Sequence, residues 1–160
     1  MSAAVQLIGD ASYRQHRTLG VVEVSPMRPS ERSFVADNWV EGVVEAQGHG
    51  RRSGSRHRHA YLVAAGRAVD AHLRDPNVSV LVARDAECGP RAYGWIAGLG
   101  HTLLWTCVKR DHRREGLAHI LLAALTRELG APRYFAVRSR HDALAERVGL
   151  QHRPLTEASE

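Results

Sequence analysis

Apolar residues recur at every third or fourth position in three segments of the chain, which predicts three amphipathic helices. The first spans 29–48, with Ser30 as its expected N-cap residue. The second spans 60–76 and the third spans 114–129, where a glycine and a nearby proline terminate it. The expected buried positions of the three helices are Phe34, Val35, Trp39, Val43, Val44, Leu62, Ala65, Val69, Leu73, Leu117, Ile120, Leu121, Ala124, Leu125 and Leu129.

Shorter apolar runs predict strands around these helices. The links between the runs 78–85, 91–99 and 102–110 are so short that we expect three strands paired as antiparallel hairpins. A run at 133–139 follows the third helix, so it can lie parallel to 102–110 through a right-handed crossover. The remaining predicted elements are a first strand at 20–26, a short helix at 141–149 and a last strand at 150–155.

In chain order these elements read β-α-α-β-β-β-α-β-α-β. That order predicts an α/β (α+β) fold, in which a mixed, mostly antiparallel central sheet carries helices on both faces. Residues 1–19 are only weakly patterned, and we expect them to form a loosely packed N-terminal extension. The rest of the chain, 20–157, has a length that suits a single domain.

Composition limits the class of protein. Hydrophobic residues make up 44% of the 160 positions and charged residues 24%, which is ordinary for a globular protein. No apolar run approaches the roughly 20 residues that a membrane span needs, and the first residues lack the pattern of a signal peptide. The two cysteines, Cys88 and Cys107, do not suggest a disulfide framework. We therefore expect a cytoplasmic protein with no membrane partner.

The chain is basic, with a net charge of +5, and Lys109 is the one lysine among its 22 basic residues. Such charge suits an anionic ligand or a polyanionic partner. Part of it lies in 48–59, GHGRRSGSRHRH, which is expected to be a loop. Because its histidines His49, His57 and His59 have no cysteine or carboxylate beside them, we expect no metal site. The loop either faces solvent or favours an acidic or phosphorylated acceptor.

The stretch KRDHRREGLAHILL, 109–122, begins the third helix with a cluster of positive charge. A helix N-terminus already carries about half a positive charge, so arginines are mildly unfavourable there. They become favourable if an anion binds the free N–H groups at that N-terminus. The alternative is that Arg113 and Arg114 simply face water.

The element order and this stretch together resemble the GCN5-related N-acetyltransferase (GNAT) family. The family motif is a strand ending in valine, then a turn, then Arg or Gln, two variable residues, Gly, one further residue, and Gly or Ala. Here the strand ends at Val108, and the motif residues are Arg113, Arg114, Glu115, Gly116, Leu117 and Ala118. The resemblance covers about 20–155 and implies acetyl-CoA as the acyl donor. These residues would then hold its diphosphate, with Gly116 leaving room for the close approach.

The resemblance also implies where the rest of acetyl-CoA lies. The pantetheine arm would pair with a bulged strand like an added strand, lined by Trp105, Thr106, Cys107 and Val108. A backbone N–H of that strand would stabilise the oxyanion that forms on the thioester carbonyl. Plain core packing explains Trp105 equally well.

The catalytic residues depart from the family pattern. A tyrosine often stands four residues before a Gly-Phe pair, but here the pair is Gly149-Leu150 and the position holds Ala145. The remaining candidates for acid or base are His101, Cys107, His112 and His141. We favour His101 as the catalytic base, since it starts the strand at the expected substrate end. Cys107 as an acetylated nucleophile competes with Cys107 as a small buried apolar residue.

Three functions therefore stand. The first is transfer of an acetyl group from acetyl-CoA to an amine of a small molecule or protein. The sequence is compatible with an acceptor that carries negative charge, and with a homodimer. The second is a catalytically inactive GNAT-fold protein that binds CoA or serves as an interaction or virion component. FVADNWV, 34–40, resembles small acetyltransferase-like proteins of tailed phages. The third is nucleic-acid binding, which we do not expect because aromatic and basic residues do not interleave.

Overall fold

The computed structural model describes residues 5–8, 11–16, 19–49, 57–87, 91–136, 146 and 149–153. They form one eight-stranded sheet whose strand order, β1 to β8, follows the order of the chain. The strands are β1 Val5–Ile8, β2 Ala11–His16, β3 Gly20–Pro26, β4 Val78–Asp85, β5 Ala92–Leu99, β6 Thr102–Val108, β7 Tyr134–Phe135 and β8 Gln151–His152. The helices are α1 Arg32–Ala46, α2 Arg58–Arg74 and α3 Leu117–Leu129, with 3-10 turns η1 Pro29–Glu31 and η2 Arg110–His112.

The sheet is antiparallel from β1 to β6 and becomes parallel where β6 meets β7 and β7 meets β8. The parallel pairing is possible because α3 lies between β6 and β7 in the chain. Gly98 of β5 pairs with Leu103 and Ala97 pairs with Trp105, so Leu104 is an extra residue that makes a bulge in β6. The expected mixed, mostly antiparallel sheet is therefore confirmed.

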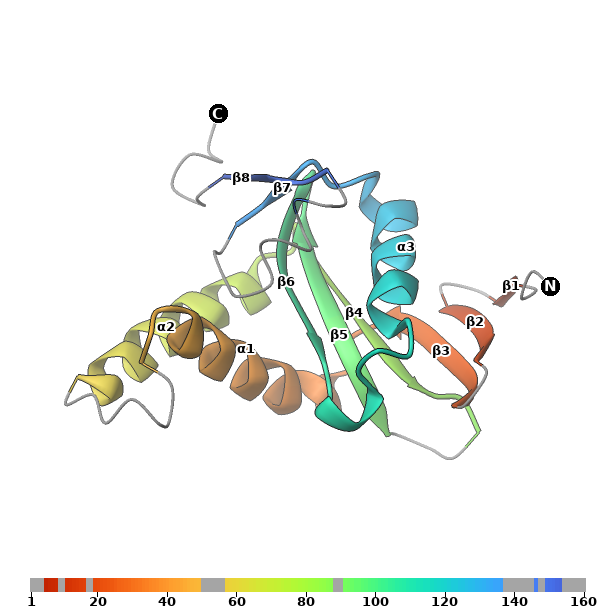
Figure 1. Ribbon diagram of the computed structural model, residues 1–160, viewed down its shortest axis with the longest axis horizontal. Coiled ribbons are helices and arrows are strands. Elements are labelled where there is room, and N and C mark those ends of the chain that lie inside the picture. The colour runs from red at the N-terminus through yellow and green to blue at the C-terminus, as the bar shows by residue number, and fades with distance from the viewer. Residues whose placement is uncertain are drawn as a thin grey trace.

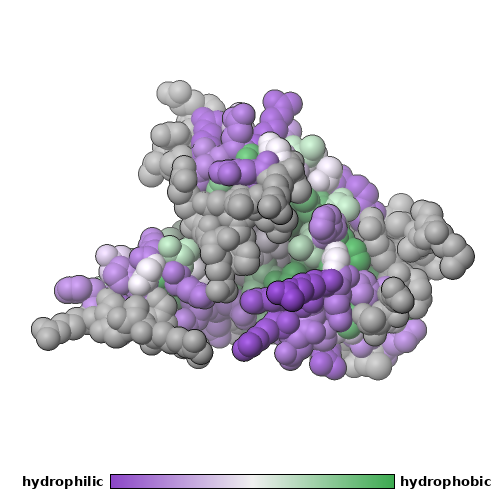
Figure 2. Space-filling view, viewed as in Figure 1, coloured by the Kyte–Doolittle hydropathy of each residue, from purple (hydrophilic) through white to green (hydrophobic). Residues whose placement is uncertain are grey.

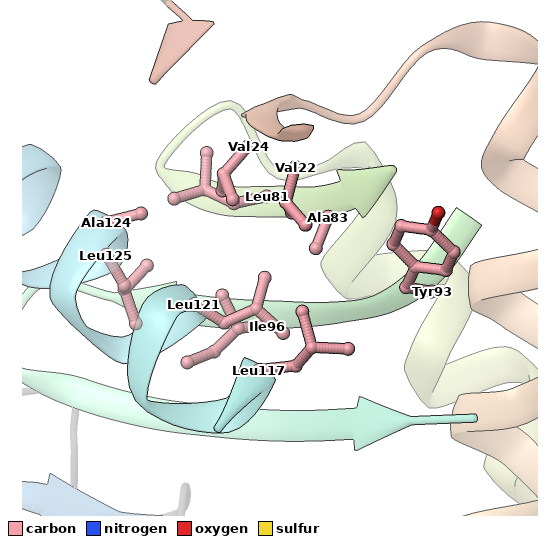
Figure 3. Packing of buried hydrophobic residues seen from close by; sticks show 10 residues of the cluster. All are labelled: Val22, Val24, Leu81, Ala83, Tyr93, Ile96, Leu117, Leu121, Ala124 and Leu125. Atoms are coloured by element: carbon pink, nitrogen blue, oxygen red, sulfur yellow. The ribbon is translucent and has the colours of Figure 1, made fainter. Parts of the chain in front are cut away.

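Helices cover both faces of the sheet, α3 on one and α1 with α2 on the other (Figure 1). Alternation along β4 divides its side chains between the two faces: Leu81 and Ala83 turn toward α3, while Val80 and Val82 turn toward α1 and α2. Figure 3 shows the α3 side, where leucines at helical spacing meet the strands. The buried residues of that cluster are Val22, Val24, Leu81, Ala83, Tyr93, Ile96, Leu117, Leu121, Ala124 and Leu125.

The face beneath α1 and α2 holds two tryptophans among valines and alanines and only one buried leucine, Leu104. Trp39 of α1 and Trp95 of β5 are 2% and 0% exposed, and their ring centroids lie 5.3 Å apart. His72 of α2 stacks on Trp39 with the ring centroids 5.6 Å apart. Burial lowers the pKa of His72, against the opposing charge of Asp75, so the ring is held neutral in this core.

Three local predictions differ from the structure. Two strands, β1 and β2, lie within the segment that we expected to be a loosely packed extension, and β2 pairs with β3 along its length. The N-cap residue of α1 is Glu31 and not Ser30, and no side chain caps this helix. The Glu31 carboxylate instead accepts the N–H of Arg28, the N-cap residue of η1, at 2.8 Å. The third helix begins at Leu117 after a separate 3-10 turn. The helix predicted at 141–149 lies outside the described residues apart from its two positions 146 and 149.

A buried ionic cluster joins β3, β4 and η1. Arg84 is 0% exposed and donates to both carboxylate oxygens of Glu31, at 2.8 and 2.7 Å. It also donates to Glu23, its register partner on β3, at 2.7 Å, and to the Ser25 hydroxyl. Arg28 adds a second cation to Glu23 at 2.9 Å. Every charge in this cluster therefore has an opposite charge in contact, which buried charges require.

None of the helices that the structure describes combines the length and the apolar composition needed to cross a membrane.

Candidate functional site

The segment that joins β6 to α3 is the most unusual piece of backbone in the described chain. The Lys109 N–H donates to the Tyr93 carbonyl at 2.9 Å and ties the end of β6 to β5. After η2, φ is −74° at Arg113, 66° at Arg114 and 83° at Gly116. Arg114 is the one non-glycine residue with positive φ in the described ranges, so φ is negative at Glu115. Backbone of alternating φ sign turns successive N–H groups toward a common point and binds anions.

Several backbone N–H groups of this segment have no acceptor among the described residues. From Arg114 to Ala118, five consecutive backbone N–H groups contact no acceptor within the described part of the chain. Gly116 occupies the N-cap position of α3, where no side chain caps the helix, and the first turn holds no acidic residue. Helix N-termini usually satisfy such groups with a capping side chain or a ligand. Within the described part of the chain, the segment predicted to bind an anion therefore keeps five donors without an acceptor.

Positive charge surrounds these N–H groups. The side chains of Arg110, Arg113 and Arg114 are exposed, and Figure 2 shows hydrophilic side chains gathered over the segment between β6 and α3. Arg113 is partly fixed, because its Nε donates to the Val108 carbonyl at 3.0 Å. Lys109 instead lies over the Phe34 ring of α1, with Nζ 4.8 Å from the ring centroid.

A histidine and a carboxylate lie beneath this loop. His112 is 9% exposed, and its ring meets the edge of Tyr93 with the centroids 4.8 Å apart. Its Nδ1 is 4.0 Å from Glu115 Oε2, a buried oxygen that accepts no hydrogen bond from the described residues. This burial does not favour His112 as an acid for a ligand on the outer side of the loop.

The second half of β6 faces α1. Trp105 lies against Gly42, where an added Cβ would come within 2.5 Å of the indole ring. The Cys107 thiol lies 4.0 Å from the Asn38 Oδ1, so the thiol points at an acceptor on α1. Burial raises the pKa of Cys107 despite the nearby charges of Arg113 and Lys109. A thiol that stays protonated at neutral pH does not suit the acetylated-nucleophile role, and it agrees with a place in the wall of the site.

The described pairing between β6 and β7 is limited to the first residues of β6. Thr102 pairs with Tyr134 and Leu103 with Phe135, and the Ala136 N–H donates to the Leu103 carbonyl at 3.0 Å. From Leu104 onward, the β7 side of β6 has no partner among the described residues. The bulge at Leu104 lies where this pairing ends.

His101 lies at the other end of β6 from the motif. Its ring is exposed beside Gly130, at the C-terminus of α3, and Nδ1 is 3.3 Å from the Ala131 carbonyl. Since a carbonyl only accepts, this contact places the proton on Nδ1 and leaves Nε2 unprotonated in the neutral ring. Its role as a base stays a prediction, as does that of His141, which lies outside the described residues together with Ala145.

The structure therefore places Cys107, Val108 and 113–118 at one end of β6 and His101 at the opposite end. Their roles in cofactor binding and catalysis stay predictions. Sequence reasoning missed two contacts of this site. One is Asn38, which meets Cys107 from α1. The other is His16 of β2, whose Nε2 lies 2.5 Å from the Glu115 carbonyl oxygen. Among the described residues, no three or more His, Cys, Asp or Glu side chains gather closely enough to hold a metal ion.

Comparison with known proteins identifies similar folds among solved structures. No family model and no curated protein matches the sequence. Among solved structures, the chain is similar to YycN of Bacillus subtilis, assigned as an acetyltransferase, at 15% identity and TM-score 0.58, over 87% of this chain and 98% of that one. It is also similar to an acetyltransferase from Thermus thermophilus, at 15% identity and TM-score 0.50, over 80% and 85% of the two chains.

A third similar structure is a protein from Desulfovibrio desulfuricans assigned to the GNAT family of acetyltransferases, at 20% identity and TM-score 0.42. The match covers 68% of this chain and 65% of that one, so this chain spans slightly under two thirds of its length. At these identities the likeness concerns the fold alone. The chain has the fold of the GCN5-related N-acetyltransferases.

Proposed function

We propose that the loop from Lys109 to Ala118 binds the diphosphate of acetyl-CoA, and that the chain transfers the acetyl group to an amine. One observation carries the proposal: the five consecutive N–H groups of 114–118 have no acceptor among the described residues, and they stand at an uncapped helix N-terminus next to three exposed arginines, Arg110, Arg113 and Arg114. Such a site offers what an anion needs, which is several donors and positive potential without a competing carboxylate cap.

The residues present fit a diphosphate. Gly116 has φ 83°, and a Cβ built on it would meet nothing within 4 Å, so space lies open next to the free N–H groups. Arg110 and Arg114 have exposed guanidinium groups that can add charge-assisted hydrogen bonds to phosphate oxygens. Both the space and the donors are therefore available without rearranging the loop.

The edge of β6 after the bulge suits the pantetheine arm. An extended amide-containing chain can pair with the backbone of Leu104 to Val108 as an added strand, because no described residue pairs with that side. The walls of such a groove would include Cys107 and the neighbouring Thr106. Bound acetyl-CoA supplies a thioester that an amine can attack, and a β6 backbone N–H would stabilise the charge on its carbonyl oxygen.

The catalytic base and the charge of the acceptor amine are also part of the proposal. The free amine must lose a proton before it attacks, and His101 is the proposed base through Nε2. A net charge of +5 favours an acceptor that carries negative charge in addition to its amine. Cys107 is not assigned as a nucleophile, since it is partly buried and its raised pKa favours the protonated thiol.

Cofactor binding is tested with a matched pair of valine variants, Gly116→Val and Gly100→Val. Both glycines have positive φ, 83° and 52°, and an added Cβ meets nothing within 4 Å at either position. Each variant should lose roughly 1–2 kcal/mol of stability, because valine is strained in the left-handed region. Acetyl-CoA at 100 times its Kd adds about 2.7 kcal/mol by mass action.

The melting temperature should therefore rise with acetyl-CoA in the wild type and in Gly100→Val, and stay unchanged in Gly116→Val. An equal rise in both variants would exclude the loop as the diphosphate site. Release of CoA thiol in the presence of a panel of amines then tests transfer. Binding without release across a broad panel would support the inactive, CoA-binding alternative, which the alanine at position 145 favours.

A further inference from the structure

The strand β2 reaches the proposed diphosphate loop through one side chain. His16 is the last residue of β2, and its Nε2 lies 2.5 Å from the Glu115 carbonyl oxygen although 99 positions separate them. The same ring contacts its own turn, because the Leu19 N–H reaches Nδ1 at 3.3 Å. A carbonyl only accepts and an N–H only donates, so the ring carries its proton on Nε2 and leaves Nδ1 as the acceptor.

The contact between His16 and Glu115 fixes the orientation of the whole peptide group between Glu115 and Gly116. In a trans peptide the carbonyl of Glu115 and the N–H of Gly116 point in opposite directions within one plane. When His16 holds the carbonyl on the β2 side, the Gly116 N–H is turned to the opposite side. That N–H is one of the five donors at the start of α3 that have no acceptor among the described residues.

The loop needs such support, because its backbone is strained where the contact is made. Arg114 has φ 66°, which is unfavourable for a residue with a Cβ, and it directly precedes Glu115. No hydrogen bond within the described residues reaches the N–H groups of 114–118. Without an outside contact the 115–116 peptide could rotate, and one donor would turn away from the ligand.

We propose that His16 is a positioning residue for the diphosphate: it orients the Gly116 N–H through the Glu115 carbonyl. This inference rests on the proposed function of the loop. It assigns β2, a strand outside the predicted domain, a part in cofactor affinity.

Three variants separate the two ring contacts described above, to the Glu115 carbonyl and to the Leu19 N–H. The amide nitrogen of glutamine can reach the position of Nε2, so His16→Gln keeps a donor for Glu115. Asparagine is shorter, so His16→Asn keeps an acceptor for the Leu19 N–H and loses the donor to Glu115. His16→Ala loses both. The probe is CoA, with its Kd measured by calorimetry, and urea denaturation of each variant verifies that it is folded.

We expect His16→Ala and His16→Asn to weaken CoA binding about tenfold, which is the loss of a good hydrogen bond, and His16→Gln to stay within about threefold of the wild type. In glycine-labelled protein, the Gly116 amide signal of the two weak variants should shift before CoA is added, and that of His16→Gln should shift less. Equal affinity in all four proteins overturns the inference alone. Equal weakening in His16→Gln and His16→Asn also overturns it, because the Leu19 turn or general packing would then be the cause. A wild type that binds no CoA overturns the proposed function as well.

Discussion

Arg84 and Arg114 carry the same guanidinium group in opposite surroundings. Arg84 is fully buried, and the carboxylates of Glu23 and Glu31 and the Ser25 hydroxyl accept its hydrogen bonds. Arg114 is exposed in a loop of positive φ, beside five N–H groups that have no acceptor in the described chain. Every charge of the buried region has an opposite charge in contact, whereas the N–H groups of 114–118 have no acceptor among the described residues.

The difference separates stability from binding. A buried charge with complete partners serves the fold, because leaving it unpaired would be expensive. Free donors at a helix start are inexpensive while they face water, and they become useful when an anion arrives. Changes at the Arg84 cluster should therefore alter the free energy of unfolding, and changes at the loop should alter ligand affinity.

The largest effect is expected from Arg84→Met. Removing the cation leaves Glu23 and Glu31, which are 8% and 5% exposed, as buried carboxylates without their main partner. Breaking a buried pair in this way costs about 3–5 kcal/mol, measured as the loss in free energy of unfolding in urea. Arg74→Met is the matched control, because Arg74 pairs with Asp70 at 2.7 Å on the surface and should cost less than about 1 kcal/mol. Similar losses in free energy of unfolding in Arg84→Met and Arg74→Met would contradict the special role of the buried cluster.

An intermediate effect on the free energy of unfolding is expected when acid protonates the Glu23 carboxylate. Burial on its own raises the pKa of Glu23, but hydrogen bonds from Ser25 and Arg84 and the charges of Arg84 and Arg28 outweigh it, so the pKa lies below 4.5. A carboxyl with a depressed pKa contributes stability above its unfolded pKa and loses it as pH falls through the folded value.

We therefore expect the wild type to exceed Glu23→Gln in free energy of unfolding at pH 7. The gap should narrow as the pH falls below about 4.3, the ordinary pKa of glutamate, and close once Glu23 is protonated in the folded protein. Urea denaturation at a series of pH values measures the gap. A gap that stays constant down to about pH 2 would show that the charge of Glu23 is not what the cluster uses.

The smallest effect on stability is expected from Arg114→Gly. Glycine adopts φ 66° without strain, so the free energy of unfolding should rise by at most about 1 kcal/mol, part of the gain being lost to the freer unfolded chain. Affinity for CoA should fall a few-fold in the same protein, because one guanidinium is gone. Arg113→Gly is the comparison, since φ is −74° there and glycine should only destabilise. A loss of stability in Arg114→Gly would mean that this arginine has a structural partner.

The elements with strong periodicity were predictable from the sequence. The stripe of α3 from Leu117 to Leu125 and the three hairpin strands β4, β5 and β6 agree with the structure to within a few residues. Core helices and strands bury one face, so their pattern is imposed by packing. The motif loop was predictable for another reason, because its glycine and its basic residues are adjacent in the chain.

The strands β1 and β2 were missed although a signal existed. Gly9-Asp10 stands between Val5–Ile8 and Ala11–His16, and a Gly-Asp pair between two short runs is a hairpin signal. A hairpin at the edge of a sheet is held largely by backbone pairing, which leaves little hydrophobic pattern to detect.

The partners of Arg84 and of Glu115 were missed because they depend on register. Arg84 is in phase with Val80 and Val82, so a cation on the buried face of β4 could have been suspected. Its pairing with Glu23 follows only once β3 and β4 are aligned. His16 meets Glu115 across 99 positions, and no local pattern encodes such a contact.

The agreement between strand order and chain order has a consequence for how the molecule assembles. From β1 to β6 each strand pairs with its predecessor in the chain, mostly through short connections, and such local contacts form early. The groove edge of β6 is completed only after α3 has folded back and β7 has joined in parallel. We expect a refolding chain to acquire its antiparallel ribbon first and its capacity to retain CoA last.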